Sequence, residues 1–328
     1  MQQIDFLAIG DIVTDAFIRL KDAEATCDLD HANCKLSLRF GDKVPYESVE
    51  ELRAVGNSAN ATVSATRLGL TTALVSHIGD DYQGEGCMAE LEKNGVGSMY
   101  IQKHIGLATN YHYVLWYDVE RTILIKHTEF PYSLPADLEA PKMIYLSSLG
   151  ENSLSFHQEI ATFLTQHPET KLVFQPGTFQ MKFGIDKLKN LYAQTYAFFC
   201  NLEESQRILG TKETDVKVLI HSLHELGPKN VFITDGINGA YASDGTSTWF
   251  MPIYPQDPYE RTGAGDAFAS TVSAALLLGK TIPEALMWGP INSASVVQDV
   301  GAQKGLLERE VLEARLAAAP ATYQPKEI

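Results

Sequence analysis

The chain has 328 residues, enough for one large α/β domain or for a domain of about 250 residues with a smaller appendage. Its 45% hydrophobic content is typical of a globular protein, while 41 acidic and 26 basic residues give a formal net charge of −15. This charge repels phosphate backbones and anionic lipid, which argues against nucleic-acid and membrane-surface partners. The sequence has no apolar run of about 18 residues and no basic segment before its first apolar run, so we expect a cytoplasmic protein.

Short apolar runs alternate with helical patterns over the first two thirds of the chain. The expected strands are 4–9, 73–78, 143–146, 172–174, 196–200 and 231–234, and the expected helices are 84–94, 153–166, 185–193, 203–209 and 216–226. Alternation of this kind predicts βαβ units, that is, an α/β fold with a central, largely parallel sheet flanked by helices.

The last third of the chain has a different pattern. Residues 264–278, 282–297 and 308–318 are predicted helices, which we expect to form a cap over one end of the sheet. The tail from Pro320 onward is expected to be loosely held.

Two segments depart from the alternation. Residues 19–53 mix polar and β-branched side chains, and residues 110–127 alternate in the manner of a β-hairpin. Strands inserted away from a main sheet often cover a ligand cleft. We therefore expect one domain over residues 1–328, with a small β lid formed from about 16–54 and 108–128.

Glycines and small residues lead directly into a predicted helix at Gly263-Ala264-Gly265-Asp266. Backbone N–H groups at a helix start are unpaired and favour an anion, and glycines let the backbone approach a phosphate closely. A carboxylate at such a site repels phosphate. Asp266 is therefore interpreted either as a general base for a hydroxyl that attacks the phosphate or as a side chain that stabilises the helix N-terminus.

With these residues in view, the chain resembles the PfkB, or ribokinase-like, family of carbohydrate and nucleoside kinases over nearly its whole length. Four segments carry the resemblance in family order: residues 10–15 (Gly-Asp-Ile-Val-Thr-Asp), residues 56–62 with Gly69 and residues 79–81, residues 201–204 (Asn-Leu-Glu-Glu), and residues 262–269 around the Gly-Ala-Gly-Asp turn. The resemblance implies a ribokinase-like fold with a β lid and transfer of phosphate from ATP to a hydroxyl of a sugar or related polyol.

The resemblance also implies residue roles. Asp266 falls on the catalytic aspartate, with Gly263, Ala264 and Gly265 as the anion-binding turn. The implied substrate-binding residues are Asp15, Gly56, Asn57 and Asn60. The implied nucleotide-binding residues are Asn201, Glu204, Thr234, Gly236, Gly239, Asn292 and Ser295. Glu204 is expected to act on Mg²⁺ through water, because Mg²⁺ tends to keep its waters.

Other interpretations of these residues stay open. Asn60 can cap a helix instead of contacting a sugar, and Glu204 can stabilise the first turn of its helix. Asn292 and Ser295 can be ordinary polar residues of a helix surface.

The sequence departs from the family pattern at two places. The first signature commonly begins with two glycines, but here it begins Val55-Gly56, which narrows the space beside the sugar. The second signature usually opens Asp-Thr, but here it opens Glu260-Arg261. In many relatives that aspartate helps to form a monovalent-cation site, so whether the activity depends on potassium stays open. Arg261 could instead place a positive charge near the transferred phosphate.

Three function hypotheses remain. A sugar kinase is preferred. A nucleoside kinase would need a base-stacking surface, for which the lid offers Tyr111, Tyr113, Trp116 and Tyr117, although alternating hairpin residues usually pack. A non-catalytic sugar-binding relative is suggested by the departures in both signatures, whereas the intact turn before Asp266 argues against it.

The lid raises two further questions. Cys27, His31 and Cys34 have soft ligands at short spacing, but a zinc site needs a fourth ligand and tighter spacing, so we expect reduced cysteines that pack the lid. Four cysteines are also too few for a disulfide framework at this length.

Exposed strand edges of the lid, together with the oligomeric habit of the family, predict a homodimer through the lid. The acceptor, its phosphorylation state and the phosphate donor stay open.

Overall fold

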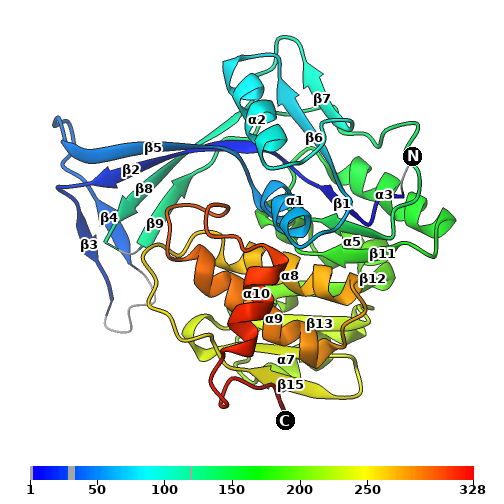
Figure 1. The fold of residues 1–328 in the computed structure, drawn as a ribbon. Coiled ribbons are helices and arrows are strands. Elements are labelled where there is room, and N and C mark those ends of the chain that lie inside the picture. The colour runs from blue at the N-terminus through cyan, green and yellow to red at the C-terminus, as the bar shows by residue number, and fades with distance from the viewer. Residues whose placement is uncertain (1–2, 29–33, 119) are drawn as a thin grey trace.

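The computed structural model describes residues 3–28, 34–118 and 120–328, and its largest element is a ten-stranded sheet (Figure 1). The strand order is β16-β15-β14-β13-β12-β11-β10-β1-β6-β7. The strands are β1 (Phe6–Ile9), β6 (Thr72–Gly79), β7 (Ile101–His104), β10 (Met143–Leu146), β11 (Lys171–Phe174), β12 (Thr195–Asn201), β13 (Asn230–Thr234), β14 (Ala240–Ser243), β15 (Thr248–Met251) and β16 (Lys326–Glu327). In this order, each strand from β13 to β7 pairs in parallel with its neighbour, whereas β14, β15 and β16 add to the other edge in antiparallel pairings. The predicted largely parallel sheet is confirmed.

Helices cover both faces of this sheet. They are α1 (Asn57–Arg67), α2 (Tyr82–Lys93), α3 (Leu154–Gln166), α4 (Thr178–Phe183), α5 (Ile185–Gln194), α6 (Leu202–Leu209), α7 (Val216–Glu225), α8 (Ala264–Leu277), α9 (Ile282–Val296) and α10 (Arg309–Ala317), with a short 3₁₀ turn at Gly236–Asn238. In β1, Phe6 and Ala8 pack with α1, α8 and α9, whereas Leu7 and Ile9 pack with α3, α5 and α7. Because β1 is buried on both faces, its sequence is a continuous apolar run.

Two expectations about the C-terminal third are wrong. The helices α8, α9 and α10 pack on one face of the sheet and do not cap its end (Figure 1). The tail is also held: Tyr323 is buried, its hydroxyl donates to the Met287 carbonyl at 2.7 Å, and β16 pairs with β15. The tail therefore completes one edge of the sheet.

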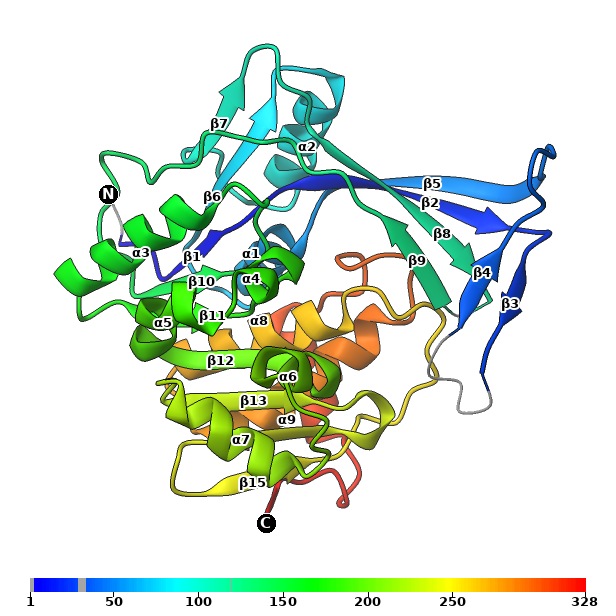
Figure 2. The same ribbon diagram turned by 180° about the vertical axis from the view of Figure 1, so that it is seen from behind.

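A second sheet projects beyond the main one (Figure 2) and has the strand order β5-β2-β8-β9. Its strands are β2 (Val13–Leu20), β5 (Tyr46–Val55), β8 (Asn110–Tyr117) and β9 (Glu120–Leu124). They overlap the two segments from which the sequence predicts a lid, although β2 begins three residues before residue 16 and β5 ends one residue after residue 54. The pairing register places Asp15 beside His112 on one face, and Tyr113 beside Leu124 on the other. We call this four-stranded sheet the lid.

A two-stranded hairpin, β3 (Glu24–Thr26) and β4 (Lys35–Ser37), extends the lid. The expectation of reduced cysteines is wrong here, because a disulfide joins Cys27 to Cys34 beside this hairpin. Neither sulfur is therefore a free thiolate for zinc, and His31 lies outside the described residues. Over the described ranges there is no group of three His, Cys, Asp or Glu side chains that could hold a metal ion, and no helix is long and apolar enough to span a bilayer.

Candidate active site

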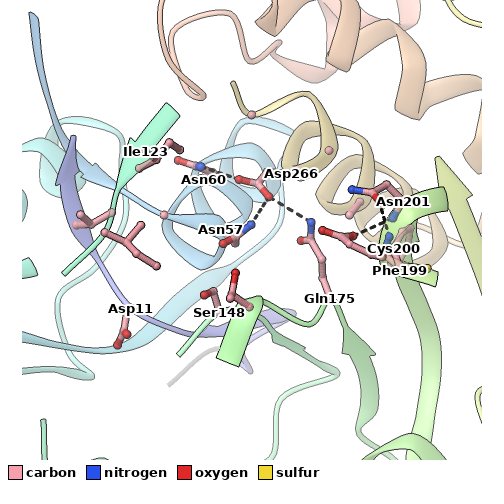
Figure 3. Close-up of a pocket in the computed structure, with 18 of the residues that line it drawn as sticks. Asp11, Asn57, Asn60, Ile123, Ser148, Gln175, Phe199, Cys200, Asn201 and Asp266 are labelled. Atoms are coloured by element: carbon pink, nitrogen blue, oxygen red, sulfur yellow. Dashed lines mark hydrogen bonds between the residues drawn. The ribbon is translucent and has the colours of Figure 1, made fainter. Parts of the chain in front are cut away.

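A pocket of about 420 Å³ opens at the carboxyl ends of the main-sheet strands, beneath the lid (Figure 3). The ends of β1, β10, β11, β12 and β13, the starts of α1 and α8, and the inner face of the lid each contribute residues. Open α/β sheets bind ligands at this edge because polar loop residues and helix N-termini converge there. The pocket is lined by residues of both sheets and of the helix starts. Those discussed below are Asp11, Asp15, Gly56, Asn57, Asn60, His112, Arg121, Ile123, His127, Gln175, Asn201, Glu204, Thr234, Arg261 and Asp266.

The centre of the pocket is the carboxylate of Asp266, which accepts hydrogen bonds from three side-chain amides (Figure 3). Asn57 Nδ2 donates to Oδ1 at 2.7 Å, Asn60 Nδ2 donates to Oδ2 at 2.8 Å, and Gln175 Nε2 donates to Oδ1 at 3.2 Å. Two of the predicted sugar-binding residues therefore face the predicted catalytic residue. Oδ1 accepts two bonds and Oδ2 one, which leaves hydrogen-bonding capacity at Oδ2.

Two further residues fix the orientation of these amides. Gln303 Nε2 donates to Asn60 Oδ1 at 2.9 Å, so the NH₂ of Asn60 is turned toward Asp266. The buried hydroxyl of Tyr145 donates to Gln175 Oε1, so the NH₂ of Gln175 is turned the same way. Since an amide has one donor end and one acceptor end, each of these bonds selects the rotamer that presents N–H to the carboxylate.

Burial dominates the electrostatics of this carboxylate. Asp266 is 9% exposed, and the loss of water raises its pKa above the ordinary value of 3.8 although the three amide bonds and the charge of Arg121 oppose the rise. A carboxylate with a raised pKa is a stronger base than an exposed one.

The glycine turn brings this carboxylate to the start of α8. Gly263 has φ +82°, and a Cβ there would lie 2.3 Å from the Ala302 Cβ. At Gly265 no described atom outside the local backbone lies within 4 Å of the position of a Cβ, and the residue lines the pocket. The first residue allows the turn, and the second leaves the helix N-terminus open to an approaching anion.

One wall of the pocket carries two carboxylates, each of which faces a histidine. Asp11 accepts hydrogen bonds from Tyr132 Oη at 2.9 Å and pairs with His127 Nδ1 at 3.0 Å. Asp15 lies 3.4 Å from His112 Nδ1 across the lid pairing between β2 and β8. The sequence prediction selected Asp15 but not Asp11, although Asp11 also follows the first strand directly.

The opposite side of the pocket holds Asn201 and Glu204. Asn201 Oδ1 accepts from the Glu204 N–H at 2.8 Å, and Glu204 Oε2 accepts from the Asn201 N–H at 2.9 Å, so the pair forms a capping box at the start of α6. Burial raises the pKa of Glu204, against the bond from the Asn201 backbone. Both residues line the pocket, as does Thr234 at the end of β13.

Four predicted nucleotide-binding residues do not line this pocket in the described part of the chain: Gly236, Gly239, Asn292 and Ser295. Asn292 is fully buried, donates to Thr271 Oγ1 at 2.7 Å and accepts from the Leu307 N–H at 2.9 Å. Its amide is used between α8, α9 and the following loop, so the expected adenine contact is corrected to a structural role. Gly236, Gly239 and Ser295 stay predictions.

The two departures from the family signatures also have structural explanations. Val55 pairs with Val13 in the lid and does not line the pocket among the described residues, whereas Gly56 has φ +112° and a Cβ there would lie 2.6 Å from the Asp11 carbonyl oxygen. Glu260 is 1% exposed. Its Oε1 accepts from the Thr262 N–H and hydroxyl, and its Oε2 accepts from the Gly301 N–H at 3.3 Å. Both carboxylate oxygens of Glu260 therefore already accept hydrogen bonds from N–H or O–H groups of the protein.

The aromatic residues considered for stacking a base do not line the pocket within the described ranges. Tyr111 donates its hydroxyl to Glu51 and makes an edge contact with Tyr113 on the outer face of the lid. Trp116 packs edge-on against Tyr259 at 5.5 Å. Alternation along β8 places Tyr111 and Tyr113 on the outer face of the lid and Trp116 on its inner face, where Trp116 packs against Tyr259.

The pocket contains residues that the sequence prediction missed. Gln175, His112, His127 and Arg121 belong to this group, together with Gln303 behind the pocket. Gln175 follows a predicted strand and could have been found from that position alone. The others lie far from any recognisable motif, and only the tertiary fold brings them to Asp266 and its neighbours.

Comparison with known proteins agrees with this geometry. A family model described as pfkB family carbohydrate kinase matches residues 23–309. The ribokinase of Bacillus subtilis (strain 168) is 27% identical over 268 residues, covering 80% of this chain and 87% of the relative. The nucleoside kinase of Methanothermobacter thermautotrophicus is 25% identical, covering 92% of each.

The fold is also that of solved structures. The structure of Arabidopsis thaliana ribokinase complexed with ribose and ATP has a TM-score of 0.79 and 20% identity, and covers 96% of this chain and 99% of that one. The ribokinase-like fold class and the resemblance drawn from the four sequence segments are both confirmed. The chain therefore belongs to the pfkB family of carbohydrate kinases, a family of phosphotransferases that act on sugars or nucleosides.

Proposed function

We propose that this protein transfers the terminal phosphoryl group of ATP to a hydroxyl of a sugar or related polyol, with Asp266 as the general base. The observation that carries the proposal is the carboxylate of Asp266, held by three amide donors beside the open N-terminus of α8. Phosphoryl transfer needs positioning and charge stabilisation more than covalent chemistry, and this arrangement offers both.

In the proposed reaction the acceptor hydroxyl lies between the Asp266 carboxylate and the terminal phosphorus of ATP. Its oxygen bonds to phosphorus, the bond from that phosphorus to the bridging oxygen of ADP breaks, and the hydroxyl proton passes to Asp266 Oδ2. Backbone N–H groups of residues 263–265 stabilise charge on the transferred group. The lid excludes water, so that the hydroxyl and not water is the nucleophile.

The acceptor would lie against Asp15, Asn57 and Asn60, as predicted, with Asp11 added. Nucleotide phosphates would lie toward Asn201 and Thr234. Glu204 would hold Mg²⁺ through water, which fits a pocket-lining carboxylate whose charge is penalised by burial. A magnesium ion held there would supply positive charge that offsets the negative charge of the phosphates. A potassium site at Glu260 has less support than the Mg²⁺ site, because both carboxylate oxygens of Glu260 already accept hydrogen bonds from the protein.

A sugar is a better acceptor than a nucleoside for this pocket. The lid tyrosines do not line the pocket in the described residues, whereas carboxylate and amide groups suited to several hydroxyls do. A coupled ADP-release assay over pentoses, hexoses, sugar phosphates and nucleosides tests the assignment. We expect turnover with at least one sugar or sugar phosphate and little with nucleosides. Turnover confined to nucleosides would make this a nucleoside kinase, and sugar binding without transfer would indicate a non-catalytic relative.

We also propose a homodimer through the outer face of the lid. Val49, Tyr113 and Leu124 share that face and are 47%, 49% and 51% exposed. Large apolar side chains grouped on an exposed sheet face are typical of an interface. Light scattering after size exclusion should give a dimer, and Tyr113→Glu with Leu124→Glu should give a monomer. The matched change Val218→Glu on α7, 46% exposed, should leave the dimer intact. A monomeric wild-type protein would contradict this proposal.

A further inference from the structure

The carboxylate of Glu260 joins three segments of the chain just before the glycine turn. Its Oε1 accepts hydrogen bonds from the N–H of Thr262 at 2.7 Å and from the hydroxyl of the same residue at 2.6 Å. Its Oε2 accepts from the N–H of Gly301, in the loop after α9, at 3.3 Å. From the lid, Nε of Arg121 lies 3.9 Å from Oε1. Glu260 therefore lies where the turn, the loop and the lid meet.

The glycine turn depends on this junction. Thr262 directly precedes Gly263, and a Cβ on Gly263 would lie 2.3 Å from the Cβ of Ala302, so the turn packs closely against the loop that binds Oε2. The turn carries the N–H groups proposed to stabilise the transferred phosphoryl group, and it leads to Asp266. A change in the charge or position of the Glu260 carboxylate would therefore reach the reacting groups.

The lid supplies the positive charge that faces this carboxylate. Glu260 is 1% exposed, and a buried carboxylate without a counter-charge is strongly destabilising. Among the described residues, Arg121 of β9 is the basic side chain within ion-pair distance of Glu260. The other arginine nearby, Arg261, pairs with Glu120 at 2.8 Å. In Figure 2, β9 accordingly lies beside the segment that leads to α8.

Arg121 acts on Glu260 through its charge and not through a hydrogen bond. Its Nε is buried, has no acceptor in the described part of the chain, and is too far from Glu260 Oε1 for a hydrogen bond. A closing movement of the lid by about 1 Å would make this bond. Because a buried N–H without an acceptor is costly, the free energy of this bond favours the closed lid.

The charge of the same arginine also reaches the catalytic carboxylate. Arg121 lines the pocket, and its charge opposes the rise that burial causes in the pKa of Asp266. One guanidinium therefore offsets the charge of two buried carboxylates, Glu260 at the turn and Asp266 at the reacting centre.

A bound monovalent cation does not fit these residues. The oxygens of Glu260 already accept three hydrogen bonds from Thr262 and Gly301. A cation at the same carboxylate would also lie close to the guanidinium of Arg121, and two positive charges at such a distance repel each other. The place that a cation would take is therefore unfavourable while Arg121 is present.

We propose that Arg121 supplies, from the lid, the positive charge that a monovalent cation supplies beside this turn in many relatives, so that phosphoryl transfer by this enzyme needs no potassium. The proposal rests on the kinase function proposed above and adds to it how the turn is kept electrically balanced. Since the charge belongs to the lid, closure of the lid over the substrate and completion of the turn are one event.

The kinetic test measures turnover in buffers free of alkali-metal ions, with potassium chloride or choline chloride added to equal ionic strength. The wild-type kcat/KM should differ by less than about twofold between the two salts. Arg121→Gln should be less active in choline chloride and at least about fivefold more active in potassium chloride, as is typical of coupling between two sites. Its uncompensated Glu260 would then take the cation from solution.

Three variants control this test. Arg121→Lys keeps the positive charge and should remain indifferent to potassium. Arg261→Gln breaks the other ion pair between lid and turn but leaves Glu260 untouched, so its rate should be the same in both salts. Arg121→Gln combined with Glu260→Gln should lose the potassium response, because no buried carboxylate is left to attract the cation.

Melting temperatures give a readout that needs no turnover. A cation that binds the folded state alone raises the melting temperature. Potassium should therefore raise that of Arg121→Gln by at least about 2 °C over its value in choline chloride, whereas the wild type and the double variant should show no such difference. If no sugar is phosphorylated at all, the kinase assignment fails, but this shift would still establish that Arg121 takes the place of a cation.

Two results would overturn the proposal. One is a wild-type enzyme that is inactive in choline chloride and active in potassium chloride. The other is an Arg121→Gln variant that responds to potassium no more than the wild type, both in kcat/KM and in melting temperature. The second result would show that the charge of Arg121 serves another purpose.

Discussion

Replacing Asp266 by Asn should lower kcat about a thousandfold while leaving the affinity for ATP nearly unchanged, since a positioned general base contributes about 10²- to 10⁴-fold. The variant loses the group that takes the proton from the acceptor hydroxyl. It keeps a side chain of the same size between Asn57 and Asn60, although one of these amides must rotate to pair with the new NH₂ group. Steady-state kinetics with calorimetric ATP binding measure both quantities.

The pH dependence gives an independent check on the same residue. Asp266 must be ionised to accept a proton, and burial raises its pKa above 3.8. The wild-type kcat/KM should therefore fall as the pH drops through a value above 3.8, and this acid limb should disappear in the residual activity of Asp266→Asn. Near-wild-type turnover of the variant, or an unchanged acid limb, would contradict the assignment.

Replacing Gly263 by Ala should cost activity through the backbone alone. Its φ of +82° disfavours any residue with a Cβ, and the new methyl would lie 2.3 Å from the Ala302 Cβ and 2.5 Å from its Cα. The turn must shift, which moves the start of α8 and Asp266 with it. A displacement of about 1 Å at a reacting group can cost about a hundredfold in rate, so we expect a loss of kcat of that order.

Gly279→Ala separates the effect of the clash from that of the dihedral angle. Gly279 has φ +83°, but no described atom outside the local backbone lies within 4 Å of the position of its Cβ. It follows the far end of α8, so its replacement should lower the melting temperature slightly and leave kcat unchanged. Equal kinetic losses in both variants, or full activity of Gly263→Ala, would show that the turn does not position the catalytic group.

The sequence predicted the main sheet and the central residue of the site for physical reasons. Strands buried on both faces are continuous apolar runs, so 143–146 was found with its observed bounds. Asp266 was selected because it follows a glycine turn at a predicted helix start, where it could act as a base or stabilise the helix N-terminus, and because this turn resembles the second family signature. The antiparallel strands β14 (Ala-Tyr-Ala-Ser) and β15 (Thr-Trp-Phe-Met) were missed, since neither is a continuous aliphatic run and four residues are too few to show a clear alternation.

The contacts within the site could not be predicted, because they join residues far apart in the chain. Asn60 and Gln303 are 243 positions apart, and Asn57 and Asp266 are 209 apart. No local pattern indicates that Asn60 donates to Asp266 instead of capping a helix. Asn292 shows the opposite error: a polar residue one helical turn from Ser295 resembled a ligand contact, yet its amide satisfies buried groups of the core.

The most direct measurement follows the labelled terminal phosphate of ATP through a single turnover with the best acceptor sugar. We expect the label to appear in covalent linkage to the sugar in the wild-type reaction, with one ADP formed for each phosphorylated sugar, and to remain on ATP with Asp266→Asn over the same time. Label released only as inorganic phosphate, or transferred to the sugar equally fast by both proteins, would contradict the role given to this carboxylate.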